Sequence, residues 1–161
     1  MVDRGKIIEK LTFEGNKISE LFSSFSKNEW EILLYFDEME WQVKDLLAHF
    51  ISSERSFLLL FENIRLHDQG APEHFSIIEF NNLQVTQMKE IQVKELVELF
   101  RKTRDKTVNW VKVVNDSDLE KVGRHPAMGE AKIVDMVKMI YLHNQMHLRD
   151  LALALKNQKK F

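Results

Sequence analysis

Cysteine is absent from this sequence of 161 residues, and its absence excludes several kinds of chemistry. The chain can form no disulfide, no thiolate zinc site and no nucleophilic thiol of its own. If thiol chemistry occurs, a small molecule must bring the sulfur. Glycine and proline are also scarce, with five and two residues, so the turns that many short strands require have few places to form. The composition favours helices.

Neither sign of charge dominates, and no long apolar run occurs. The 23 Lys and Arg residues nearly balance the 25 Asp and Glu residues, and neither sign forms a block. We therefore expect no binding to nucleic acid, because a phosphate backbone is bound by clustered cations. No segment approaches the roughly 18 apolar residues of a membrane span, and the first residues, MVDRGKIIEKLTFEGNK, lack the apolar centre of a signal peptide. These features predict a cytoplasmic protein that does not enter a membrane.

Hydrophobic residues are present in the amount and spacing of a helical domain. They make up 44% of the chain, which is enough for one core, and we expect a single domain over residues 1–161. Apolar residues recur at intervals of three, four and seven, as on one face of a helix. This spacing predicts four long helices, at about residues 4–25, 41–65, 86–114 and 132–157.

The segments between these helices differ in character. Residues 31–40, EILLYFDEME, give no clear prediction. Residues 66–84 and 116–132 contain glycine and proline and are predicted to be long irregular connections. Asn115 is the predicted left-handed end of the third helix. The fold class predicted is all-α: a four-helix bundle with long connections between helices 2 and 3 and between helices 3 and 4.

Two histidines stand four residues apart on the last predicted helix. They share one face with apolar residues at spacings of three or four, and that face must point at the core. The members of the face are Met136, Ile140, His143, His147, Leu151 and Ala154. His49 lies near the inward stripe of the second helix. Three neutral imidazoles from two helices can hold one divalent ion and leave positions open for water or substrate.

A hydrogen-bonded or partly exposed core position is the alternative for these histidines. Six histidines placed at random in 161 positions give roughly 0.2 pairs at this spacing, so the pair alone is a weak motif. Burying three basic side chains without a shared partner is costly, however, and one ion would satisfy all three. A zincin motif is excluded because Asn144 stands where its glutamate belongs, and no Glu-x-x-His occurs for a di-iron site.

Other residues carry weaker predictions. His67, His74 and His125 fall in or beside the connections, where solvent exposure is expected. Two aspartates could orient a histidine ring by accepting a hydrogen bond from its free nitrogen; they are Asp45 and Asp150. A carboxylate on a helix is more often simply exposed to solvent. Aromatic and methionine side chains could line a substrate pocket or belong to the plain core; they are Trp41, Phe50, Met136, Met139 and Met146.

Three motifs occur in an order that resembles one protein family. Trp-x-Val-x-x-x-Leu-x-His begins at Trp41, His-Pro-x-x-Gly begins at His125, and His-x-x-x-His begins at His143. From about Trp30 to its end, the sequence resembles the DinB-like superfamily, which includes the YfiT-type thiol transferases. It departs from the family at GEAK, where members often have a threonine that caps the following helix.

The resemblance implies a bundle in up-down-down-up order, a homodimer, and a site for zinc or nickel formed by His49, His143 and His147. It also implies a metal-dependent S-transferase that joins a low-molecular-weight thiol, such as bacillithiol or mycothiol, to an electrophile. The alternatives are a metal-dependent hydrolase, a bundle that binds a metal or small ligand without chemistry, and a structural bundle with empty, hydrogen-bonded histidines. All of them remain open at the level of sequence.

Overall fold

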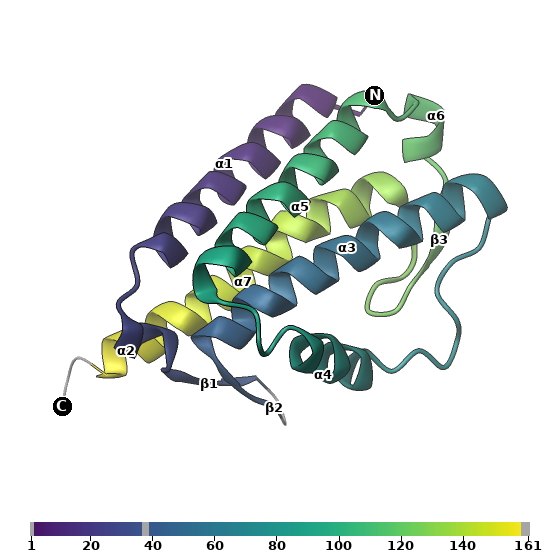
Figure 1. The fold of residues 1–161 in the computed structure, drawn as a ribbon. Coiled ribbons are helices and arrows are strands. Elements are labelled where there is room, and N and C mark those ends of the chain that lie inside the picture. The colour runs from purple at the N-terminus through teal and green to yellow at the C-terminus, as the bar shows by residue number, and fades with distance from the viewer. Residues whose placement is uncertain (1, 37–38, 159–161) are drawn as a thin grey trace.

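Four long helices dominate the computed structural model, which describes residues 2–36 and 39–158 (Figure 1). These are α1 (Arg4–Ser23), α3 (Val43–His67), α5 (Val93–Val113) and α7 (Ile133–Gln158). Shorter helices lie in the connections: α2 (Lys27–Trp30), α4 (Ile77–Gln87) and α6 (Asp116–Leu119). The predicted all-α four-helix bundle is confirmed. Among the described residues, no helix is both long and apolar enough to cross a membrane.

The long helices run in up-down-down-up order. Figure 1 shows α1 and α7 pointing one way and α3 and α5 pointing the other. Because α3 and α5 follow each other and are parallel, the chain must travel back along the bundle between them. The connection that contains α4 does this, and α4 packs against α3. The long crossover predicted between helices 2 and 3 is therefore present, with a helix inside it.

Most of the long helices begin and end close to the predicted positions, with two differences at α5. Its predicted start at residue 86 is wrong, because residues 86 and 87 still belong to α4 and α5 begins at Val93. Asn115 is not a left-handed stop: its φ is −69°, and it precedes α6 as that helix's N-cap. The left-handed C-cap is Asp68 at the end of α3, with a φ of 52°.

Two short antiparallel hairpins lead into the helices that carry the three histidines. The first joins β1 (Leu33–Phe36) to β2 (Met39–Gln42), and the second joins β3 (Val122–His125) to β4 (Gly129–Lys132). The strand β2 runs directly into α3, and β4 runs directly into α7. Each hairpin therefore fixes the direction in which one of these helices starts.

The second hairpin also contacts the connection after α3. Ala71 N donates a hydrogen bond to Arg124 O at 2.7 Å. A Cβ atom built on Gly70 would lie 2.2 Å from Arg124 N, so only glycine allows the two backbones to approach this closely. This contact joins two segments that are far apart in the sequence and lie beside the same cavity, described below.

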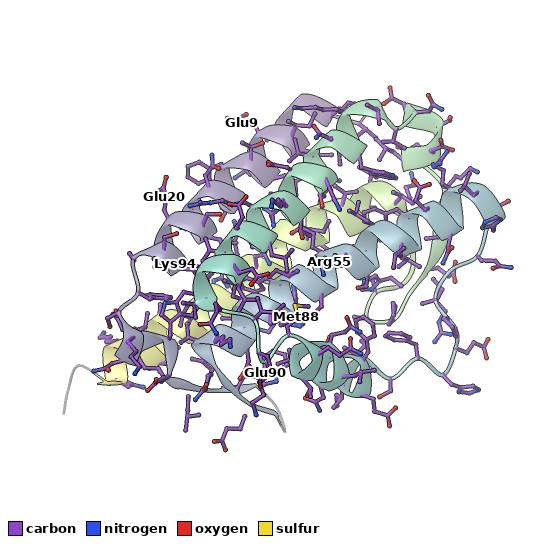
Figure 2. All side chains as sticks on the ribbon, in the orientation of Figure 1. Glu9, Glu20, Arg55, Met88, Glu90 and Lys94 are labelled. Carbon is purple, nitrogen blue, oxygen red and sulfur yellow. The ribbon has the colours of Figure 1, made fainter. Side chains whose placement is uncertain are left out.

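The apolar core consists of two clusters, one toward each end of the bundle. One includes Phe22, Leu46, Phe50, Phe100 and Leu151, and the other includes Leu11, Phe61, Val111, Ile133 and Ile140. The residues between them on the helices include buried polar ones: Glu14, Glu54, Arg104, Asn144 and His147. His49 is also buried and lies on α3 among residues of the first cluster, near this polar layer. Other charged side chains lie outside, as Glu9 and Glu20 do on the outer side of α1 (Figure 2). Buried polar groups need partners, so this middle layer is where a site is expected.

Candidate metal centre

The structure brings His49, His143 and His147 together in this polar layer. The Nε2 atoms of His49 and His143 are 3.1 Å apart, and those of His147 and His143 are 3.0 Å apart. All three residues offer a ring nitrogen within 4.8 Å of the others. His49 and His147 are buried, with 3% and 8% of their surface exposed, whereas His143 is partly buried. The predicted convergence of the three rings is present, and metal binding itself stays a prediction.

Helical spacing and aromatic packing position these rings. His143 and His147 lie one turn apart on α7, and α3 packs against α7 so that His49 meets them. The ring of Trp41 lies 4.9 Å from that of His49, centre to centre, and Phe50 lies 6.3 Å from His143 and 6.0 Å from His147. The donors therefore sit against apolar walls.

Burial keeps at least two of these imidazoles neutral at physiological pH. The pKa of His49 is held well below its ordinary value, first by burial and then by repulsion from His143 and His147. The pKa of His143 is lowered to about 3 by burial and by the nearby His147 and His125. A neutral imidazole has a lone pair that a metal ion can bind without displacing a proton.

The donor set fits one divalent ion. Nitrogens bound at about 2.0–2.1 Å to the same ion stand about 3–3.5 Å apart, which agrees with the distances measured to His143 Nε2. The planes of the rings are nearly perpendicular, at 71° for His49 and His143 and 88° for His143 and His147. The rings therefore do not stack, and each offers a nitrogen within 4.8 Å of the others. The chemistry of three imidazoles suits zinc and nickel.

Neither aspartate considered as an orienting group takes that role. Asp45 Oδ2 accepts a hydrogen bond from Gln42 N at 2.9 Å and so caps the start of α3. Asp150 lies on the exposed surface of α7. Among the described residues, His49 Nδ1 has no hydrogen-bond partner, and packing against Trp41 holds the ring instead. The interpretation as ordinary surface carboxylates is therefore the better one for both aspartates.

An arginine that the sequence did not single out forms a second buried group beside the triad. Arg104 Nε and Nη2 donate to the two carboxylate oxygens of Glu54 at 2.8 and 3.0 Å. Nη2 also donates to Asn144 Oδ1 at 2.7 Å, and Nη1 donates to Leu11 O at 2.8 Å. A Cβ atom on Gly15 would lie 2.7 Å from Arg104 Cγ, so this glycine makes room for the side chain. Asn144 stands next to His143, and the group fixes α7 against α3 and α5.

A cavity of about 410 Å³ lies beside the triad, and His49 and His143 form part of its wall. The other walls come from α3, the connection containing α4, α7, and the turn between β3 and β4. Met139 and Met146 line this cavity, as one of the two interpretations of the methionines expected. Trp41, Phe50 and Met136 belong to the apolar core.

His125 lines the same cavity, and its predicted solvent exposure is wrong. Its ring is half-buried and stacks on Phe57 with centres 5.0 Å apart and planes at 19°. Its Nδ1 accepts hydrogen bonds from the backbone N–H groups of Ala127 and Met128 at 3.1 and 3.2 Å. Burial lowers the pKa of His125. The only sequence signal for this position was the His-Pro-x-x-Gly motif, which predicts a turn.

Together, the bundle topology and the buried histidines define a class of helical proteins with a histidine site between two helices. The chain belongs to the DinB superfamily, whose sequence profile matches residues 11–151. No curated protein matches the sequence significantly.

Solved structures share the fold at low sequence identity. One is described as "YfiT from Bacillus subtilis is a probable metal-dependent hydrolase with an unusual four-helix bundle topology"; it is 13% identical, with a TM-score of 0.78, over 99% of this chain and 90% of that one. A mycothiol-dependent maleylpyruvate isomerase is 13% identical with a TM-score of 0.76, and a mutant of it is 12% identical with a TM-score of 0.74. Both matches cover 93% of this chain but only 61% of the isomerase.

Proposed function

We propose that His49, His143 and His147 bind one divalent ion, zinc or nickel, and that the protein is a metal-dependent S-transferase. Its substrates would be a low-molecular-weight thiol of the bacillithiol type and a small electrophile. The observation that carries the proposal is the approach of two Nε2 atoms to within 3.0 and 3.1 Å of His143 Nε2, in a buried layer. Without a shared ion, so much buried imidazole would destabilise the fold.

The histidines, the aromatic residues beside them and the cavity would each have a separate role in this reaction. His49 and His143 offer neutral nitrogens at pH 7 because burial lowers the pKa of each. Three neutral ligands leave the full charge of a bound ion uncompensated, and that charge would favour the thiolate form of a thiol at neutral pH. Trp41 and Phe50 keep water from the rings, and the adjoining cavity offers space for the second substrate.

The chain contributes no thiol, since it has no cysteine. In the transfer, the thiol loses its proton to water and its sulfur forms a bond to the electrophilic carbon. With an alkyl or aryl chloride, the carbon–chlorine bond breaks and chloride leaves with the electron pair. No oxidant or reductant is needed.

The names of the similar structures support thiol chemistry and one alternative. The isomerase is described as mycothiol-dependent, which makes a thiol cosubstrate a reasonable expectation for a related site. The description of YfiT as a probable metal-dependent hydrolase favours the second candidate function, hydrolysis by a water activated at the same three histidines. The homodimer and the cytoplasmic location stay predictions.

The test is a thiol-transfer assay with the metal-loaded protein, bacillithiol and an aryl chloride whose thioether product absorbs light. We expect turnover that needs metal and is lost in His147→Ala. The matched control is His67→Ala, which removes an exposed histidine at the end of α3 and should leave turnover unchanged. Equal activity of His147→Ala and the wild type would refute the mechanism. Hydrolysis of an ester or amide without thiol consumption would favour the hydrolase instead.

A further inference from the structure

Among the described residues, no charged side chain lines the cavity beside the triad. Its 21 lining residues contain no Asp, Glu, Lys or Arg, although these make up 30% of the chain. Three of its polar members are the histidines His49, His125 and His143. The hydroxyls of Ser53 and Ser56 donate to backbone carbonyls of α3. In the metal-free protein, an anion buried among these described residues would find no cation, and such burial is costly.

The outer part of the cavity is apolar as well. Leu59, Phe75 and Ile77 line it while remaining exposed, Leu59 to 69%. Exposed apolar side chains around a concave site are typical of places where an apolar ligand binds. The inner part ends at the nitrogens of His49 and His143, where the proposed reaction takes place.

His125 provides a hydrogen-bond donor inside this cavity. Its Nδ1 accepts from two backbone N–H groups and therefore carries no proton. In a neutral imidazole the proton then lies on Nε2, which is a donor. Stacking on Phe57 and the two backbone hydrogen bonds hold the ring in place, so the donor is oriented before any ligand arrives.

We infer that this cavity binds the electrophile, that the electrophile is an uncharged and mainly apolar molecule, and that His125 Nε2–H donates a hydrogen bond to one acceptor atom on it. The inference rests on the proposed function, because it takes the triad as the reaction centre. It predicts that the walls of this cavity away from the metal site do not bind a carboxylate group. It also gives the His-Pro-x-x-Gly turn a part in binding.

Three probes of similar shape test the inference: 2-acetylnaphthalene, which is neutral with an acceptor, 2-ethylnaphthalene, which lacks the acceptor, and 2-naphthoate, which is charged. Binding is followed by NMR of the methionine methyl groups. Met128, Met139 and Met146 line the cavity and should shift, whereas Met88, at the end of α4, is not among its lining residues and should stay. We expect the ketone to bind about three- to tenfold more tightly than the hydrocarbon and at least about tenfold more tightly than the carboxylate. Naphthoate binding as tightly as the ketone would overturn the inference.

The variant His125→Asn isolates the donor. The asparagine oxygen can accept from the same backbone N–H groups as Nδ1, but the shorter side chain loses the Nε2–H group. In His125→Asn, the ratio of the Kd of the hydrocarbon to the Kd of the ketone should fall to about one. His67→Asn makes the same change at an exposed histidine and should keep the wild-type ratio. In the wild type, the His125 Nε2 resonance should shift with the ketone and not with the hydrocarbon. A preference that survives in His125→Asn, or an unshifted resonance, would contradict the role of His125.

The same titrations separate this inference from the proposed function. The binding preferences are measured on metal-free protein, and thiol transfer is measured separately on metal-loaded protein. If the ketone binds more tightly than the other two probes but no thiol transfer occurs, the proposed function is wrong and the inference about the cavity is supported. If thiol transfer occurs but the preferences are absent, this inference fails alone.

Discussion

At the scale of single residues, the buried histidines give the metal-free protein a dependence on pH. Folding lowers the pKa of His49, and that of His143 to about 3, against about 6.5 in an unfolded chain. Between these values the unfolded state binds more protons than the folded state, so the free energy of unfolding falls as the pH falls. Each group contributes up to about 1.4 kcal/mol per pH unit below pH 6.5.

Urea denaturation of metal-free protein at pH 7.5, 6.5 and 5.5 measures this effect. The double variant His49→Phe with His143→Phe removes both groups and should show a shallower slope than the wild type over this range. Parallel slopes for the two proteins would show that the histidines are not kept neutral by the fold. The exposed variant His67→Phe serves as a control and should follow the wild type.

The pair formed by Arg104 and Glu54 is the other residue-scale feature that can be tested. Arg104→Met would leave the Glu54 carboxylate buried without its partner, and we expect it to lower the free energy of unfolding by about 3–5 kcal/mol. Adding Glu54→Leu should recover part of this loss. The control Arg101→Met changes an exposed arginine of the same helix and should cost less than about 0.5 kcal/mol.

Sequence reasoning found the three histidines but missed Arg104 for a physical reason. His143 and His147 share a face with apolar residues on one helix, so their inward direction follows from local spacing. The side chain of Arg104 is also buried, but a lone arginine on a helix is usually solvated. Its partners Asn144 and Glu54 lie 40 and 50 positions away in the sequence. The partnership exists only once α3, α5 and α7 are packed.

At the scale of elements, the long helices were predicted and the hairpins were not. The strands are only four residues each, too short to show a period of two against a helical background. The helix α4 was also missed, because its weakly amphipathic sequence follows Gly70 and Pro72, which indicate a loop. The helix α4 and the strands β2 and β3 pack against α3, whereas β1 and β4 pack against α7. Local sequence does not encode these contacts.

The contact between Gly70 and Arg124 is the test at this scale. In Gly70→Ala, the added methyl group must displace the backbone of β3, and we expect a loss of about 1–3 kcal/mol in the free energy of unfolding. Gly5→Ala is the control, because the nearest atom to its Cβ is 3.8 Å away and alanine favours helix. Denaturant titration compares the two. A Gly70→Ala variant as stable as Gly5→Ala would show that the backbones do not meet as described.

At the scale of the whole molecule, the triad joins two helices that the chain places 94 residues apart, measured from His49 to His143. An unfolded chain does not hold these nitrogens together, so an ion bound here should stabilise the fold. At free metal one hundred times the Kd, the free energy of unfolding should rise by about 2.7 kcal/mol. Thermal unfolding with nickel, zinc and magnesium checks this, and magnesium should have little effect because imidazole suits it poorly. His147→Ala with an undiminished response to nickel would contradict it.

The topology of the molecule was predicted, but the cavity beside the triad was not. The up-down-down-up order follows from the family resemblance and from two long connections. The shape and neutrality of the cavity depend on how the connection after α3 meets the turn between β3 and β4, through the contact at Gly70. No pattern in the sequence predicts such a contact, so His125 was predicted to be exposed to solvent.

The most direct measurement of the central claim is anomalous diffraction from crystals of protein loaded with one equivalent of nickel. We predict one anomalous peak per chain, at about 2.0–2.1 Å from the Nε2 atoms of His49, His143 and His147. A fully loaded protein with its peak elsewhere, or with no peak among these three rings, would contradict the account.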